Sequence, residues 1–167
     1  MIDRDEIVKD SVLTVAKLMA TSAITAPKAR GIDNIVVRII DKREELEKLA
    51  KAMEELAPKY GEFFKRDADN VRRSDAVVLI GCKIVDIGLQ KPKEYPLDPN
   101  LICSLLNLGI AVGSAVKTAS IHNIDNRIMY SVGVSAQYAG LIDADVVVGI
   151  PLSATGKSIY FDRRISR

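Results

Sequence analysis

The chain has 167 residues, of which 48% are hydrophobic and 28% are charged, and it contains one His and two Cys. This length and balance predict one globular domain over residues 1–167, with a core large enough to fold without disulfides or a structural metal. The formal charge of +2 is too small to predict a nucleic-acid surface. The acidic start MIDRDEIVKD lacks the regions of a signal peptide, so we expect a cytoplasmic protein.

Helices and strands are predicted from the hydrophobic period, the β-branched runs and the turn residues. In chain order they are a helix over 4–22, a strand over 35–40, a helix from 41 to 58, a short amphipathic stretch over 71–74, a strand over 76–80, a loop over 87–100, a central helix, a helix over 132–141 and a strand over 146–150. Asp41 and Glu44 form a capping-box pattern, and Asp98 or Asn100 is expected to open the central helix. The fold class that follows is α/β (α+β), with a central mixed sheet flanked by helices.

The central helix lies in residues 101–127, the most apolar long segment of the chain. Its apolar residues lie around the whole helix instead of along one stripe, so we expect it to be buried on most sides. Gly109 and Gly113 stand four apart, where they let another backbone approach closely. Polar residues such as Asn107 interrupt the run, and a membrane span needs about 20 predominantly apolar residues. We therefore expect no membrane association.

One segment imitates a phosphate-binding P-loop. Residues 149–158, GIPLSATGKS, follow a predicted strand and end in Gly-Lys-Ser. However, Pro151 stands where the motif needs Gly, and proline has no N–H to offer a phosphate. The short tail after Lys157 also leaves no room for the helix and acidic strand of a P-loop nucleotide hydrolase. This class of enzyme is therefore not expected.

Cationic residues gather at the predicted ends of the elements. They are Lys28, Arg30, Arg127, Lys157, Arg163, Arg164 and Arg167. If these loops converge, the cations form a phosphate site, and the alternative is a solvated basic rim. Likewise, residues 122–127 offer donors and acceptors for the edge of a heterocycle, or they close the central helix with Asn123 as its cap and Asp125 paired to Arg127. The pattern leaves these alternatives open.

Cys82 and Cys103 flank the proline-rich loop. Two thiolates are too few for a four-cysteine iron–sulfur cluster within one chain, although a symmetric dimer would supply four. Reduced structural cysteines are the simpler interpretation. A four-ligand zinc site cannot be drawn from the spacing.

Several segments together resemble a known family. They are RGIDNIVVRIID, SDAVVLIG, LLNLGIAVGSAVKTASIHNIDNRIMY and LIDADVVVGIPLSATGKSIYFDR. Over nearly its whole length the chain resembles an uncharacterised prokaryotic family described as containing a ferredoxin domain. Members typically carry a Cys-Gly-x-Cys-Gly type cluster before the central helix, whereas this chain retains only Cys82 and Cys103 there. An iron–sulfur cluster is therefore not expected.

More distantly, the order of segments resembles that of FMN-dependent nitroreductases. Residues 26–30 with Asn34 resemble the loop that lies against the flavin in that family, NLGIAVGSAVKTASIHNI resembles its central helix, and VVVGIPLS resembles its late strand. Residues 163–164 fall where that family commonly has cations near the FMN phosphate. This chain departs from the family at three places. The family's Arg-Ser-x-Arg start is absent, Lys28 replaces the Ser of its loop, and residues 124–126 replace its glycine turn.

This resemblance implies a nitroreductase-like homodimer that binds FMN at the subunit interface and acts as an oxidoreductase on a small-molecule redox substrate. The cofactor-binding residues that it implies are Pro27, Lys28, Ala29, Arg30, Asn34, Asn126, Arg127, Lys157, Arg163 and Arg164. No catalytic acid or base is assigned, because the flavin itself carries the electrons or hydride. Two alternatives stay open: a cofactor-less accessory protein of the same fold, and an iron–sulfur electron carrier that uses Cys82 and Cys103 from two subunits.

Overall fold

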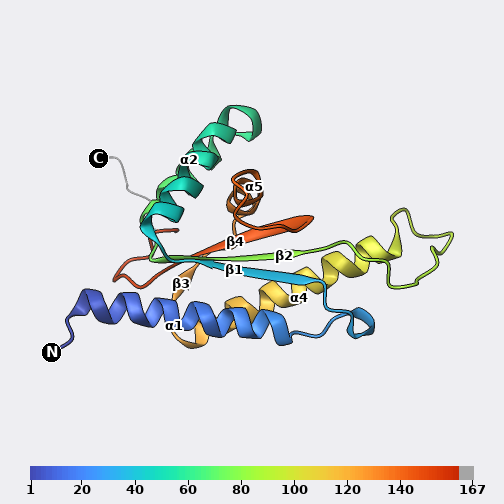
Figure 1. The fold of residues 1–167 in the computed structure, drawn as a ribbon, viewed down its shortest axis with the longest axis horizontal. Coiled ribbons are helices and arrows are strands. Elements are labelled where there is room, and N and C mark those ends of the chain that lie inside the picture. Colours follow the sequence, from blue (N-terminus) through green and yellow to red (C-terminus); the bar gives the residue numbers. More distant parts are fainter. Residues whose placement is uncertain (162–167) are drawn as a thin grey trace.

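A four-stranded antiparallel sheet separates two helical layers in the computed structural model, which describes residues 1–161 (Figure 1). The strands, in the spatial order β1-β2-β4-β3, are β1 (Ile35–Ile40), β2 (Ala76–Cys82), β4 (Val146–Ser153) and β3 (Asp125–Asn126). The helices are α1 (Arg4–Thr25), the short 3-10 turn η1 (Ala29–Gly31), α2 (Arg43–Tyr60), α3 (Phe63–Arg72), α4 (Pro99–Ile121) and α5 (Tyr130–Tyr138). One face of the sheet is covered by α1 and α4, and the other by α2, α3 and α5.

The register of β2 defines two ends of the sheet. Cys82 pairs with Ile35 of β1 and with Val146 of β4, and we call this end, which also holds η1, the loop end. At the other end Ala76 pairs with Leu152, and Leu152 pairs in turn with β3; we call this the tail end. Because a strand rises ~3.3 Å per residue, the length of β2 separates the two ends by about 20 Å.

Each helical layer contributes its own apolar cluster against the sheet. In one layer, α1 buries a stripe at helical spacing, made of Val12, Val15, Ala16, Met19 and Ala23. In the other, Phe64 of α3 is fully buried beneath α2. All residues of β2 are buried, because strands pair both its edges and helices cover both its faces. The expectation from its continuous apolar run is confirmed.

The central helix α4 is less enclosed than its sequence predicts. The Asp98 carboxylate caps its start by accepting the Asn100 and Leu101 N–H groups at 2.9 and 3.1 Å. Its inner side packs on the sheet, yet on its outer side Leu106 is 58% and Ile110 is 45% exposed. Within one chain this helix is therefore buried on one side only. Among the described residues it is also the one helix long and apolar enough to cross a membrane.

The α+β class is confirmed, but the sheet is antiparallel instead of mixed. The reason is α3, of which the sequence predicted only the last part. A single helix after β1 would return the chain to the loop end and give a parallel strand, whereas the pair α2 and α3 brings it back to the tail end. The capping box was also wrong: Lys42 precedes α2 as its N-cap, and no side chain caps it. Gly61, with φ 124°, follows the last residue of α2, so the helix continues through Pro58 to Tyr60, two residues beyond its predicted end.

Candidate functional site

A pocket of about 530 Å³ lies at the tail end, where α4 meets β3. It is lined by Val116, Ser120, Asn123, Ile124, Asp125 and Asn126. Ligand pockets in proteins commonly measure ~300–1,000 Å³ and combine apolar walls with a few polar groups. This pocket falls within that range of volumes, but it is open to solvent and its lining is mostly polar, with Asp125 as the charge in its wall.

The end of α4 shapes this pocket. Asn123 adopts the left-handed conformation, with φ 56°. Its N–H donates to the Ser120 carbonyl at 3.2 Å, and the Ile124 N–H donates to the Ala119 carbonyl at 3.0 Å. This pair of bonds is a Schellman motif, which ends the helix and turns the chain sharply. Of the alternatives for residues 122–127, closure of the helix by Asn123 is confirmed, and the turn leaves a polar wall above β3.

Two predicted cations lie near this pocket, at the tail end. Arg127 donates through Nη1 to the Tyr160 carbonyl at 3.5 Å, and its guanidinium lies 5.3 Å from the centre of the Phe161 ring. The alternative pairing of Arg127 with Asp125 is thus replaced by contacts with the C-terminal segment. The Lys157 side chain is exposed. Arg163 and Arg164 lie outside the described residues.

Tyr160 anchors the C-terminal segment to the turn between α3 and β2. Its hydroxyl lies 2.9 Å from the Ser74 hydroxyl, and both side chains are buried. Burial raises the pKa of Tyr160 to about 12, so the phenol stays protonated at neutral pH. Tyr160 and Phe161, which contact Arg127, are therefore held in a fixed position.

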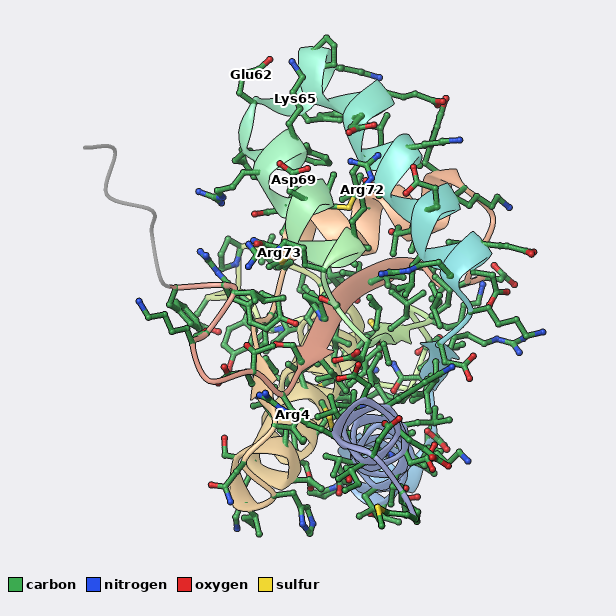
Figure 2. The ribbon with its side chains drawn as sticks, turned by 90° about the vertical axis from the view of Figure 1, so that its left-hand side faces the viewer. Arg4, Glu62, Lys65, Asp69, Arg72 and Arg73 are labelled. Atoms are coloured by element: carbon green, nitrogen blue, oxygen red, sulfur yellow. The ribbon has the colours of Figure 1, made fainter. Side chains whose placement is uncertain are left out.

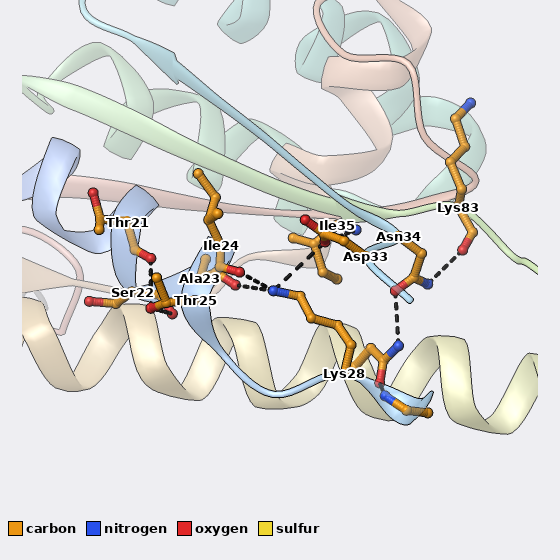
Figure 3. Close-up of polar contacts among 12 residues, drawn as sticks. Thr21, Ser22, Ala23, Ile24, Thr25, Lys28, Asp33, Asn34, Ile35 and Lys83 are labelled. Atoms are coloured by element: carbon orange, nitrogen blue, oxygen red, sulfur yellow. Dashed lines mark hydrogen bonds and ion pairs between the residues drawn. The ribbon is translucent and has the colours of Figure 1, made fainter. Parts of the chain in front are cut away.

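The other predicted residues lie at the loop end, where Lys28 is drawn into the chain (Figure 3). The Lys28 ammonium donates to the Ala23 carbonyl at 3.3 Å and to the Ile24 carbonyl, and its side chain is only 7% exposed. These carbonyls belong to the last turn of α1, where they have no intrahelical donors. Their partial negative charge favours a cation at this end of the helix. Lys28 therefore caps α1. Asp33 lies 3.7 Å away.

Asn34 is also engaged inside the chain. Its Nδ2 donates to the Lys83 carbonyl at 2.7 Å (Figure 3), and its Oδ1 accepts from Asn107 Nδ2 at 2.9 Å. Asn107 in turn accepts the Ala29 N–H through Oδ1 at 2.8 Å. Arg30 is exposed and donates to the Ile87 carbonyl at 2.7 Å, while Pro27 precedes it in the same exposed loop.

The structure thus divides the predicted site into two groups. Pro27, Lys28, Ala29, Arg30 and Asn34 lie at the loop end, and Asn126, Arg127 and Lys157 lie at the tail end. The ends are about 20 Å apart, so a small cofactor cannot touch both groups in one chain. The sequence prediction missed Asn107, although a signal was present: it is an amide in the middle of the most apolar stretch of the helix. In the structure it is 3% exposed.

The two cysteines differ in their surroundings. Cys82 is buried at the loop end of β2, and burial, with the nearby charge of Asp145, raises the pKa of its thiol. Cys103 lies on α4 and is partly exposed. Within residues 1–161, no group of three or more His, Cys, Asp and Glu side chains is arranged to hold a metal ion.

The sequence matches a known family. Residues 97–163 match the family described as "Uncharacterized protein containing a ferredoxin domain (DUF2148)". An uncharacterised protein of Archaeoglobus fulgidus is 42% identical, over 98% of this chain and 97% of its own. The chain belongs to this family. The resemblance expected from the sequence is confirmed.

Solved structures share the fold at low sequence identity. A nitroreductase family protein from Clostridium novyi NT has a TM-score of 0.60 at 17% identity, over 92% of this chain and 75% of that one. A nitroreductase with bound FMN from Desulfitobacterium hafniense DCB-2 has a TM-score of 0.60 at 13% identity, over 86% and 78%. The NADPH:FMN oxidoreductase from Vibrio harveyi, complexed with NAD+, has a TM-score of 0.59 at 10% identity, over 89% of this chain and 60% of that one. This member of the ferredoxin-domain family therefore has a nitroreductase-like fold.

Proposed function

We propose that this protein is a homodimeric FMN-binding oxidoreductase that acts on a small-molecule redox substrate in the cytoplasm. The observation that carries the proposal is the tail-end pocket, which occurs on a fold shared with a nitroreductase that has bound FMN. Fold alone does not assign chemistry. The argument therefore rests on whether the residues of this chain suit the cofactor.

The pocket suits the ring and the hydroxyl groups of a flavin. The Asn123 amide offers donors and an acceptor for a ring edge, and Asp125 accepts from hydroxyl or ring N–H groups. Asn126 Nδ2 already donates to the Ile124 carbonyl at 3.1 Å, which leaves its Oδ1 and second N–H for a ligand. Val116 and Ile124 supply apolar surface for the ring. When bound, FMN supplies the transfer of electrons or hydride, and the protein supplies binding and orientation.

The phosphate requires cations, and the residues within 1–161 that line the pocket include none. Arg127 and Lys157 lie near it at the tail end, while Arg30 lies at the loop end. A single FMN can meet both groups only if a second copy of the chain brings its loop end to this tail end. The division of the site thus favours a dimer in which each pocket is completed in trans.

The outer face of α4 supplies a surface for that dimer. Leu105, Leu106 and Ile110 are 39%, 58% and 45% exposed, and a Cβ added to Gly109 or Gly113 would meet nothing within 4 Å. An apolar face with open glycines allows another helix to approach closely and removes exposed apolar area from water. Ile110 is the midpoint of α4 (Pro99–Ile121). Antiparallel packing of two copies about this midpoint places each loop end beside the partner's tail end.

The test couples oligomeric state to FMN affinity. Ile110→Glu places a charge in the centre of the proposed interface, so we expect monomers by light scattering and loss of FMN binding in a fluorescence titration. Tyr138→Glu is the matched control, since Tyr138 is 62% exposed on α5, across the sheet from α4. It should leave both properties unchanged. Wild-type protein that is monomeric and indifferent to FMN would refute the proposal.

One observation favours the alternative of a cofactor-less accessory protein. Lys28 and Asn34, both predicted to contact the cofactor, use their polar groups for contacts within the chain. Such a protein would dimerise through α4 and yet remain colourless. A dimeric wild-type protein that does not bind FMN would therefore select this alternative.

A further inference from the structure

Asn107 joins segments that are far apart in the sequence. It lies on the buried side of α4 and is 3% exposed. Its Oδ1 accepts the Ala29 N–H at 2.8 Å, and its Nδ2 donates to Asn34 Oδ1 at 2.9 Å. Asn34 then donates to the Lys83 carbonyl at 2.7 Å. Both ends of one amide therefore fix the η1 loop, the start of β1 and the segment that follows β2.

The η1 loop needs such an anchor. Arg30 has φ 53° and Gly31 has φ 69°, so two successive residues adopt the left-handed conformation, which is strained for Arg. The bond from Ala29 to Asn107 holds the residue immediately before this strained pair. In this conformation Arg30 reaches the Ile87 carbonyl at 2.7 Å. The loop thereby lies against residues 83–98, which connect β2 to α4 and project beyond the sheet (Figure 1).

We infer that Asn107 is a positioning residue, which holds the Ala29–Gly31 loop and Arg30 in the conformation that the cofactor site requires. The inference rests on the proposed function, because the loop serves the site completed by a second copy. Asn107 acts through the loop and does not touch the cofactor, since its side chain is buried and both ends of its amide are engaged.

The contacts distinguish this role from simple packing. An apolar residue at position 107 would fill the volume, but it would leave the Ala29 N–H and the Asn34 Oδ1 without their present partner. A buried polar group without a hydrogen-bond partner is costly, and these two groups regain partners only if the loop moves toward water. The expected consequence of losing Asn107 is therefore local, at Ala29–Gly31, and not spread over the helices.

Asn107→Asp tests the inference, with Asn100→Asp as its matched control. The carboxylate introduced by Asn107→Asp still accepts the Ala29 N–H, but it presents an acceptor to Asn34 Oδ1. Asn100 uses its Oδ1 to accept the Ile87 and Leu89 N–H groups at 3.0 and 3.4 Å, so the carboxylate of the control variant keeps both contacts. For Asn107→Asp we expect amide exchange at Ala29 and Gly31 to accelerate, and the Kd for FMN to rise, each by about tenfold. Asn100→Asp should change neither.

A second pair of variants avoids a buried charge. Ala29→Pro replaces the N–H that Asn107 accepts with a ring carbon, so Asn107 loses this contact and its side chain must move aside. Lys28, with φ −120° and ψ 148°, already has the conformation of a residue before proline. Ala29→Ser keeps the N–H. We expect Ala29→Pro to weaken FMN binding by about tenfold, with little change in the Tm of the apo-protein, while Ala29→Ser matches the wild type.

The outcomes separate the two proposals. Wild-type protein that does not bind FMN would refute the proposed function, and the exchange rates would still decide whether Asn107 holds the loop. Unchanged exchange at Ala29 and Gly31 in Asn107→Asp would overturn the inference. Faster exchange in Asn107→Asp with unchanged FMN affinity would overturn the cofactor role of the loop, and so would Ala29→Pro that binds FMN like the wild type.

Discussion

The two helical layers differ in how their outer surfaces are covered. Charged side chains cover α2 and α3, where Arg72 donates to Glu54 at 2.6 Å and to Glu47 at 3.0 Å, far from Arg4 of α1 (Figure 2). The outer side of α4 exposes leucine and isoleucine instead. The first layer has an outer surface of paired charges, whereas the second exposes apolar side chains to solvent.

Glycines show the same difference. Gly133 of α5 and Gly149 of β4 let the helix and the strand touch, because a Cβ at Gly133 would overlap the Val147 carbonyl and one at Gly149 would overlap Val132. Gly109 and Gly113 of α4 have open space around them. One layer uses small residues to close an internal contact, and the other leaves them uncovered on its outside.

The largest effect is expected from Gly133→Ala. The added methyl group collides with backbone atoms of β4, which cannot move aside like a flexible side chain, so we expect a loss of about 3 kcal/mol or more in the free energy of unfolding. Gly109→Ala in the monomeric Ile110→Glu protein is the control in the other layer, where alanine favours the helix by ~1 kcal/mol. Urea unfolding measures both. A Gly133→Ala protein as stable as wild type would contradict the close contact between α5 and β4.

A moderate effect is expected from Arg72→Met. Hydrogen bonds to Arg72 lower the pKa values of Glu47 and Glu54, so this cluster stabilises the fold above the ordinary carboxyl pKa and loses its effect as the pH falls through the lowered values. The carboxylates are about two-fifths exposed, and solvent screening reduces the gain. The Tm of Arg72→Met should fall below wild type at neutral pH and converge with it in acid. Arg73→Met, at the neighbouring position, is the control: its Tm should follow that of the wild type over the whole pH range.

The sequence predicted the parts of the fold that hydrophobic patterns determine. The runs at 35–40 and 76–80 are strands, and Asp98 opens α4. The antiparallel sheet was missed because α3 is short and carries many charges, and its apolar stripe of Phe64, Ala68 and Val71 at helical spacing was overlooked. The contacts of the candidate site residues could not be predicted, since a residue that looks like a free cation, Lys28, caps a helix. Such contacts join distant segments, and a local pattern does not reveal them.

A smaller effect is expected from Tyr160→Phe, which tests the layer of α2, α3 and α5 at the tail end. Losing the bond to Ser74 should cost about 1 kcal/mol at neutral pH. The pKa of Tyr160 is about 12 in the fold against 10.0 ordinarily, so its contribution is full below the ordinary value and is lost as the pH rises through the folded one. Wild type should therefore lose stability in alkali more steeply than Tyr160→Phe. Equal alkaline slopes in denaturant titrations would show that Tyr160 is not buried as described.

The reactivity of the two thiols, Cys82 and Cys103, probes the α1 and α4 layer most directly. Modification of Cys103 is expected to have the smallest effect on stability. The raised pKa and burial of Cys82 keep it a poorly reactive thiol, whereas Cys103 is partly exposed. A disulfide reagent should therefore modify Cys103 first in the native protein and Cys82 only on unfolding, as Cys103→Ser and Cys82→Ser will distinguish. Cys103 stands seven residues before Ile110, on the same side of α4. If a second copy covers that side, the monomeric Ile110→Glu protein should react faster at Cys103 than the wild type. Equal rates would place the dimer contact elsewhere and leave the outer face of α4 for another partner.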